Sequence, residues 1–183
     1  DKEVVLAAVI NDAINLRDAN DDLKKDKEII RGALSSGLAQ GFVLQFADDS
    51  IKQDKEIVLE AIKVDIENFQ YADEKFTKDK EFVLEAVKQN GNALEYADKK
   101  LKGDKEVVLT AIKQDGGALQ YADDKFKGDK EIVLEAVKND GSALEYADEK
   151  FKADKEFVLE ALKHDGNALK YANKKLKEDK EVI

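Results

Sequence analysis

Residues 79–103 read DKEFVLEAVKQNGNALEYADKKLKG, and residues 104–128 read DKEVVLTAIKQDGGALQYADDKFKG. The same phrase recurs along the chain, because the tripeptide DKE begins at residues 1, 26, 54, 79, 104, 129, 154 and 179. The spacing is 25 residues throughout, except for one interval of 28 that holds extra residues near SSGLAQG, residues 35–41. We therefore divide the chain into seven repeats, residues 1–25, 26–53, 54–78, 79–103, 104–128, 129–153 and 154–178, followed by a stub, residues 179–183.

The first half of the repeat has the pattern of an amphipathic helix. With positions numbered from 1 to 25, the apolar residues at 4, 5, 6, 8 and 9 are spaced as on one helix face. The Asp at position 1 is a good N-cap, and Lys at position 10 suits a helix end. An Asn-Gly or Asp-Gly pair follows, as at Asn90 and Gly91. We predict a helix over positions 2–12, closed by a glycine in the left-handed conformation.

The second half of the repeat predicts another helix. Apolar residues stand at positions 15, 16, 19 and 23, with an aromatic at 18, again at helical spacing. Position 14 is a good cap residue in three repeats, at Asn92, Ser142 and Asn167. We predict a helix over positions 15–24, followed by a short link to the next Asp.

These short helices predict an all-α solenoid of about seven helix-turn-helix hairpins. Helices of about 11 residues are marginal alone, so stacked neighbours must bury their remaining apolar surface. Position 8 and position 19 are Ala in every repeat, which indicates close approach of helices. A long coiled coil is the competing fold, since 25 residues equal two heptads plus an eleven-residue step. The glycines argue against it, because each would lie in the middle of a helix at a cost of about 1 kcal/mol.

Composition limits the possible partners. The chain is 43% hydrophobic and 39% charged, with a net charge of −10 and no Cys, Pro or Met. The acidity disfavours nucleic acid, which needs a basic surface, and no apolar run reaches the roughly 18 residues of a membrane span. No signal peptide is visible, and the compartment stays open. Because the chain begins and ends inside the repeated phrase, we expect it to be part of a longer protein.

The phrase DKExVLxA, at Asp79–Ala86, and the phrase ALxYA, at Ala93–Ala97, resemble an uncharacterised tandem-repeat family called "domain of unknown function 4116". The resemblance covers residues 54–183 well and residues 1–53 less well, where Asn15, Asp18 and Arg31 depart from the pattern. Family members look like repeat arrays in larger proteins of bacteria and protists. The resemblance implies a helical repeat and supplies no chemistry.

The sequence contains no catalytic constellation. His164 is the only histidine and stands at a variable position, so it lacks the partners of a His-based metal site or a nucleophile pair. Thiol catalysis is excluded because there is no Cys. The many carboxylates recur in register, which is typical of solvated helix ends. We expect no enzyme activity, cofactor, metal or small-molecule substrate.

Two nearly invariant ladders have either a structural or a partner-binding interpretation. We favour the structural one, in which the rings pack between repeats and each Asp accepts hydrogen bonds from the next repeat. A ligand surface should vary from repeat to repeat, whereas a packing solution should repeat. The ladders are Tyr71, Tyr96, Tyr121, Tyr146 and Tyr171 at position 18, and Asp73, Asp98, Asp123 and Asp148 at position 20.

The exposed positions that vary are the better candidates for recognition. We predict a partner surface at positions 17 and 21. Its residues are Glu95, Lys99, Gln120, Asp124, Glu145, Glu149, Lys170 and Lys174. The function that we expect is a non-enzymatic scaffold presenting this face to a protein partner. The alternative is a spacer that holds another domain at a distance, which the near-identity of repeats 4–7 favours.

Overall fold

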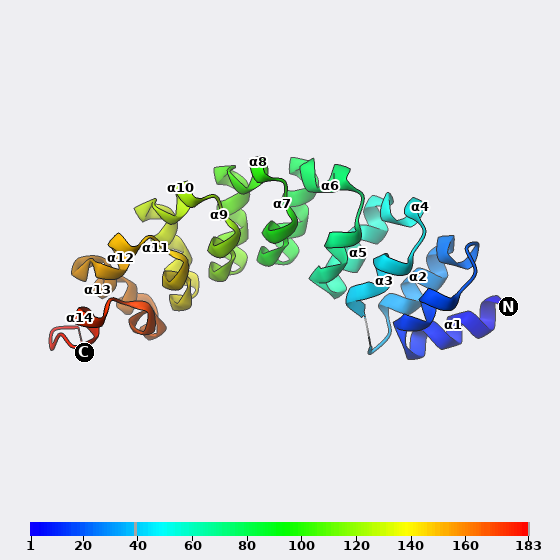
Figure 1. Ribbon diagram of the computed structural model, residues 1–183, viewed down its shortest axis with the longest axis horizontal. Coiled ribbons are helices and arrows are strands. Elements are labelled where there is room, and N and C mark those ends of the chain that lie inside the picture. The colour runs from blue at the N-terminus through cyan, green and yellow to red at the C-terminus, as the bar shows by residue number, and fades with distance from the viewer. Residues whose placement is uncertain (39, 183) are drawn as a thin grey trace. The chain divides into compact units, whose positions relative to one another are not determined.

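The computed structural model describes residues 1–38 and 40–182, and every element in this part of the chain is helical. The chain divides into two compact units, residues 1–77 and residues 78–183. Figure 1 shows both as successions of short helices. The repeated all-α architecture predicted from the sequence is confirmed within each unit.

One repeat consists of three helical segments. In repeat 4 these are α7 (Lys80–Gln89), the 3₁₀ helix η5 (Gly91–Tyr96) and the short helix α8 (Lys99–Lys102). The first helix begins where predicted, because the side chain of Asp79 accepts a hydrogen bond from the backbone N–H of Phe82 at 3.0 Å. The remaining segments of unit 2 are α9 (Lys105–Gln114), η6 (Gly116–Tyr121), α10 (Asp124–Lys127), α11 (Lys130–Asn139), η7 (Gly141–Tyr146), α12 (Glu149–Ala153), α13 (Lys155–His164), η8 (Gly166–Tyr171) and α14 (Lys174–Lys177).

Equivalent segments of unit 2 stack on one another. The long helices α7, α9, α11 and α13 each contact the next, as do the 3₁₀ helices η5, η6, η7 and η8. Each of the short helices α8, α10 and α12 contacts the long helix that follows it. Figure 1 shows the long helices side by side, with α8 and α10 along one edge. The result is a row of long helices, a row of 3₁₀ helices and a row of short helices.

Unit 1 follows the same plan with local changes. Its elements are α1 (Lys2–Asn11), η1 (Ala13–Asp18), η2 (Leu23–Lys25), α2 (Lys27–Leu34), η3 (Gln40–Phe42), α3 (Val43–Phe46), α4 (Asp49–Lys52), α5 (Lys55–Val64), η4 (Ile66–Tyr71) and α6 (Glu74–Lys78), which ends one residue beyond the unit. The extra residues of repeat 2 follow α2. Ser36 is buried there, and its hydroxyl oxygen accepts a hydrogen bond from the backbone N–H of Ala13 at 3.2 Å. The insertion is thereby attached to repeat 1.

The predicted apolar positions form the core. Repeat 5 buries its residues at positions 4, 5, 8, 9, 15, 16, 19 and 23, which are Val107, Val108, Ala111, Ile112, Ala118, Leu119, Ala122 and Phe126. Burying each large aliphatic side chain contributes about 1.5–3 kcal/mol, so stacking supplies the stability that a lone hairpin lacks. The Leu at position 6, such as Leu109, is only half-buried.

The prediction of one continuous second helix is wrong. The segment breaks at position 19, where Ala122 has extended dihedral angles of φ −70° and ψ 155°. The backbone N–H of the next residue, Asp123, donates to the carbonyl of Lys102 in the preceding repeat at 3.0 Å. A continuous helix would use that N–H internally, so the bond between repeats replaces one hydrogen bond of the helix.

The predicted roles of the glycine and of position 14 are also wrong. Among the residues that the structure describes, no glycine has a φ angle in the left-handed region between +20° and +160°. Gly116 lies instead where a Cβ atom would stand 2.3 Å from the carbonyl oxygen of Ala136 in the next repeat. The cap of the 3₁₀ helix is the residue at position 12, since the Asp115 carboxylate accepts from the N–H of Gly117 at 2.8 Å. The close approach predicted at the invariant Ala of position 8 is confirmed.

Candidate interaction surface

The DKE phrase builds the junction between repeats. Lys80 at position 2 lies 2.8 Å from the carboxylate of Asp104 and 2.9 Å from that of Glu106, both in the next repeat. The same carboxylate of Asp104 caps α9 by accepting from the N–H of Glu106. The hydrogen bond with Lys80 is the main reason that the pKa of Asp104 is lowered. These residues are therefore occupied in holding repeats together.

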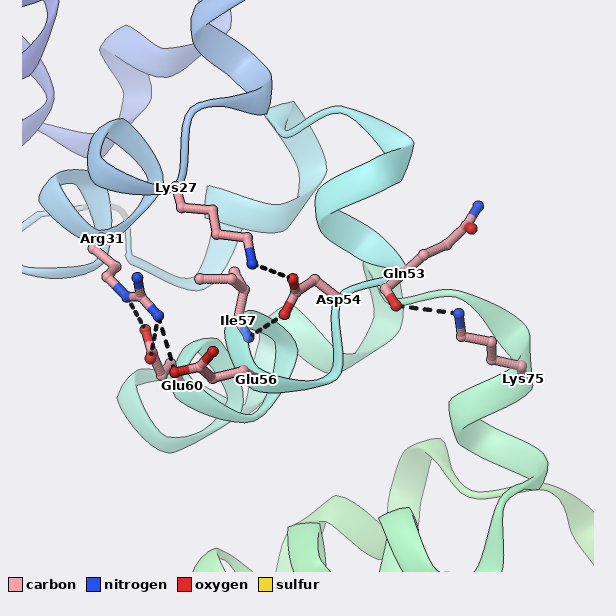
Figure 2. A network of polar contacts seen from close by, with 8 residues as sticks. All are labelled: Lys27, Arg31, Gln53, Asp54, Glu56, Ile57, Glu60 and Lys75. Carbon is pink, nitrogen blue, oxygen red and sulfur yellow. Dashed lines mark hydrogen bonds and ion pairs between the residues drawn. The ribbon is translucent and has the colours of Figure 1, made fainter.

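Unit 1 shows the same junction with an addition (Figure 2). Lys27 lies 2.6 Å from Asp54, which caps α5 through the N–H of Ile57. Arg31, which replaces the usual Leu at position 6, forms a two-pronged pair with Glu60, with both N–O distances at 2.9 Å. The departure of repeat 2 from the family pattern thus adds an ion pair between α2 and α5.

The lysines at position 22 also have a structural role. The ammonium of Lys125 donates to the carbonyl of Gly103 in the preceding repeat and lies 4.8 Å from the ring centre of Phe126. Lys150 makes the same two contacts with Gly128 and Phe151. In repeats 5 and 6 this lysine therefore joins a carbonyl and an aromatic ring, which explains its presence there without a partner.

The aspartates at position 20 are helix caps. The carboxylate of Asp123 accepts from the N–H of Lys125 at 3.1 Å, within its own repeat. Asp73, Asp98 and Asp148 make the equivalent bond. The predicted bond from this side chain to the next repeat is therefore wrong, although the ladder contributes to the fold through caps.

The tyrosines at position 18 are half-buried, and each is the last residue of the 3₁₀ helix of its repeat. Burial is the main cause that raises the pKa of Tyr121 to about 12, and its hydroxyl donates to the carboxylate of Glu95 in the preceding repeat. Burial also raises the pKa of Tyr146, with a smaller contribution from the charge of Glu145. The tyrosine ladder thus combines contacts between repeats, as at Tyr121, with partial exposure to solvent.

The predicted partner residues lie around this ladder. All are exposed except Gln120, which is half-buried. A hollow of about 280 Å³ is lined by Lys99, Lys102, Tyr121, Ala122, Asp123 and Asp124, so position 21 of two consecutive repeats meets at one ring. We call the eight predicted residues, Glu95, Lys99, Gln120, Asp124, Glu145, Glu149, Lys170 and Lys174, the variable face.

The lysines at position 24 belong to the same surface and were missed from the sequence. Lys127 pairs with Asp124 at 3.1 Å, and Lys152 pairs with Glu149 at 2.8 Å. An acid followed three residues later by Lys is the spacing of a helical ion pair, which could have indicated them. Their charge is partly neutralised by the acids of the variable face.

No group of three or more His, Asp or Glu residues in the part of the chain that the structure describes could hold a metal ion. His164 is exposed, and its Nε2 lies 3.6 Å from Glu160. The arrangement can present charges and ring edges to a partner.

Comparison with known proteins supports the repeat alone. The family described as "Domain of unknown function (DUF4116)" matches residues 1–39, 38–77, 54–102, 104–152 and 154–183. No curated protein and no solved structure matches. Within the described residues, the helices are too short or too polar to cross a bilayer.

Proposed function

Because the chain belongs to the DUF4116 family, whose function its name leaves open, we propose a function from the exposed residues. The chain is a non-enzymatic helical-repeat scaffold that presents the variable face to a protein partner. The face continues over four stacked repeats, so it suits an extended segment of that partner.

One observation carries this proposal: the residues of the variable face change from repeat to repeat, whereas the DKE phrase at the junctions does not. Position 17 is Glu95, Gln120, Glu145 and Lys170 in successive repeats, and position 21 is Lys99, Asp124, Glu149 and Lys174. The capping Asp at position 1 is present in all of them. These differences of charge from repeat to repeat give each repeat its own recognition properties.

The proposal that the chain is not an enzyme rests on its acidic side chains, which are engaged in helix caps and ion pairs. Asp104 and Asp123, as examples, cap helices, and Asp104 also pairs with Lys80. A catalytic carboxylate pair needs a cleft in which burial raises one pKa. Here the resolved shifts of carboxyl groups are downward, as for Asp104 and Asp179, which lie beside lysines.

A spacer is the second candidate, and the repeated junctions favour it. Lys80 binds Asp104 in the middle of the chain, and Lys155 binds Asp179 at 2.8 Å in the same way. The backbone bond between repeats recurs too, because the N–H of Asp148 donates to the carbonyl of Lys127 at 3.0 Å as that of Asp123 does to the carbonyl of Lys102. Recurring contacts of this kind permit addition or loss of repeats, as a length-setting element requires.

Affinity capture with two baits tests the binding proposal. The first bait is residues 1–183, and the second reverses the charges of Glu95, Lys99, Glu145, Glu149, Lys170 and Lys174. These are three acids and three bases, so the net charge stays at −10. We expect a protein that the first bait retains and the second loses. Equal capture by both would count against the variable face.

Deletion of residues 104–128 separates the scaffold from the spacer. The deletion joins Gly103 to Asp129 and restores the same junction. A recognition surface loses Gln120 and Asp124 and should bind the captured partner more weakly. A spacer should tolerate the loss of one repeat, and any effect of the deletion should depend on total length alone.

A further inference from the structure

Repeat 7 differs from its neighbours in the charge of its second half. Residues 166–177 contain Lys170, Lys174, Lys175 and Lys177 and neither Asp nor Glu. The equivalent stretch of repeat 6, residues 141–152, holds three acids and two lysines. We call the four lysines of repeat 7 the lysine cluster.

The fold of repeat 7 does not require this change of charge. Asn173 replaces the usual Asp, yet its side-chain oxygen accepts from the N–H of Lys175 at 3.0 Å, as Asp148 does from Lys150 at 3.1 Å. Its backbone N–H also donates to the carbonyl of Lys152 at 2.8 Å, which preserves the bond between repeats. The cap is therefore retained while the negative charge is lost.

The ion pair on the short helix is lost as well. In repeat 6, Lys152 pairs with Glu149, but Lys174 stands at the position of that glutamate in repeat 7. Lys177 donates to the carbonyl of Lys170 instead. The ammonium of Lys170 lies 5.1 Å from the ring centre of Tyr171, and the charge of Glu145 in repeat 6 acts on it. The cluster thus places four lysines within residues 170–177, with Lys170 beside the half-buried ring of Tyr171.

We propose that the lysine cluster binds an acidic segment of a protein partner. This proposal rests on the scaffold function. It adds that the part of the partner in contact with repeat 7 is acidic. The complement of four ammonium groups within residues 170–177 is a run of carboxylates. The net charge of −10 disfavours larger polyanions, because the acidic remainder of the chain repels those parts of a long polyanion that extend past the lysine cluster.

Fluorescence anisotropy with the whole chain tests the proposal. The probe is a labelled oligo-glutamate peptide about as long as residues 170–177. We expect binding at about 0.15 M salt and its loss at about 1 M, where the screening length falls from roughly 8 Å to roughly 3 Å. A single-stranded oligonucleotide of the same length and vesicles containing phosphatidylserine are the competing probes. Stronger binding of either would overturn the choice of partner.

Variants that exchange residues between repeats 6 and 7 provide matched controls. Lys170→Glu with Lys174→Glu gives repeat 7 the residues that repeat 6 carries, so folding should be retained. We expect affinity for the peptide to fall at least about tenfold, because the charge complement is removed. Glu145→Lys with Glu149→Lys should create a second binding stretch and raise the stoichiometry.

A third variant controls for net charge. Lys113→Glu with Lys138→Glu makes the same change of charge at exposed residues of α9 and α11, and affinity should change by less than about threefold. If this variant weakens binding as much as the repeat 7 variant does, the lysine cluster is not the site.

Selection from a displayed random-peptide library distinguishes the two proposals. Acidic peptides that no longer bind after Lys170→Glu with Lys174→Glu support both proposals. Selected peptides without acidic character, bound elsewhere on the variable face, overturn the lysine cluster and leave the scaffold standing. Selection of no peptide counts against the scaffold itself, and the anisotropy result then decides the cluster alone.

Discussion

Gly116 shows how a single residue sets the distance between repeats. A Cβ atom there would lie 2.3 Å from the carbonyl oxygen of Ala136 and 3.0 Å from atoms of Asp140. Gly91 is equally confined, with the Ala111 carbonyl at 2.5 Å. The glycine of repeats 4, 5 and 6 is therefore required by the backbone of the following repeat. Gly166 has nothing within 4 Å of the corresponding point.

We predict that Gly116→Ala destabilises the protein by about 1–3 kcal/mol, because the added methyl must push two repeats apart. Gly166→Ala is the matched control, and it should change the free energy of unfolding by less than about 0.5 kcal/mol. Urea unfolding followed by circular dichroism measures both. Equal effects of the two substitutions would show that the repeats do not approach as described.

Tyr121 makes a prediction for high pH. Its folded pKa is raised to about 12, and the ordinary value for tyrosine is about 10. The unfolded chain therefore loses this proton first as the pH rises. Its contribution to stability is complete below pH about 10 and disappears toward pH about 12.

A phenolate absorbance titration, with Tyr121→Phe to identify the signal, checks the value of this pKa. In Glu95→Gln the pKa of Tyr121 should fall but stay above its ordinary range, since burial is the larger cause. Gln already stands at this position in repeat 5 as Gln120, so the substitution suits the fold. An unchanged pKa would mean that Glu95 and Tyr121 are not in contact.

At the scale of an element, the short helix of each repeat depends on its cap. We predict that Asp123→Ala destabilises the protein by about 1 kcal/mol, because the N–H of Lys125 loses its acceptor. Asp123→Asn should be nearly neutral, since Asn173 makes the same bond in repeat 7. Thermal unfolding of both variants gives the comparison. A cost as large for Asn as for Ala would assign the effect to charge and not to capping.

Helix periodicity predicts the long helix of each repeat and its Asp cap, because both depend on neighbours in the sequence. The break at Ala122 depends on a bond to Lys102 in another repeat, which apolar spacing does not encode. The close contact at Gly116 is also made across repeats. Variation between the repeats of the sequence identified the residues of the variable face. The hollow at Tyr121 is lined by residues of two repeats, so it could be found only from the stacked structure.

At the scale of the molecule, repeats should be removable. Deletion of residues 104–128 places Lys80 opposite Asp129 and Glu131, which replace Asp104 and Glu106 with the same residue types. We predict a helical chain that still unfolds cooperatively, with the free energy of unfolding lowered by about 1–4 kcal/mol, the share of some 25 residues. Urea unfolding measures this change. Loss of cooperative unfolding would contradict the equivalence of the junctions.

Hydrogen exchange of the chain, alone and with the captured partner, tests the central claim most directly. We predict slower exchange in the 3₁₀ and short-helix rows of unit 2, residues 91–102, 116–127, 141–152 and 166–177. The long helices α7, α9, α11 and α13 should exchange as in the free chain. Protection confined to these long helices, or absent from unit 2, would contradict a binding role for the variable face.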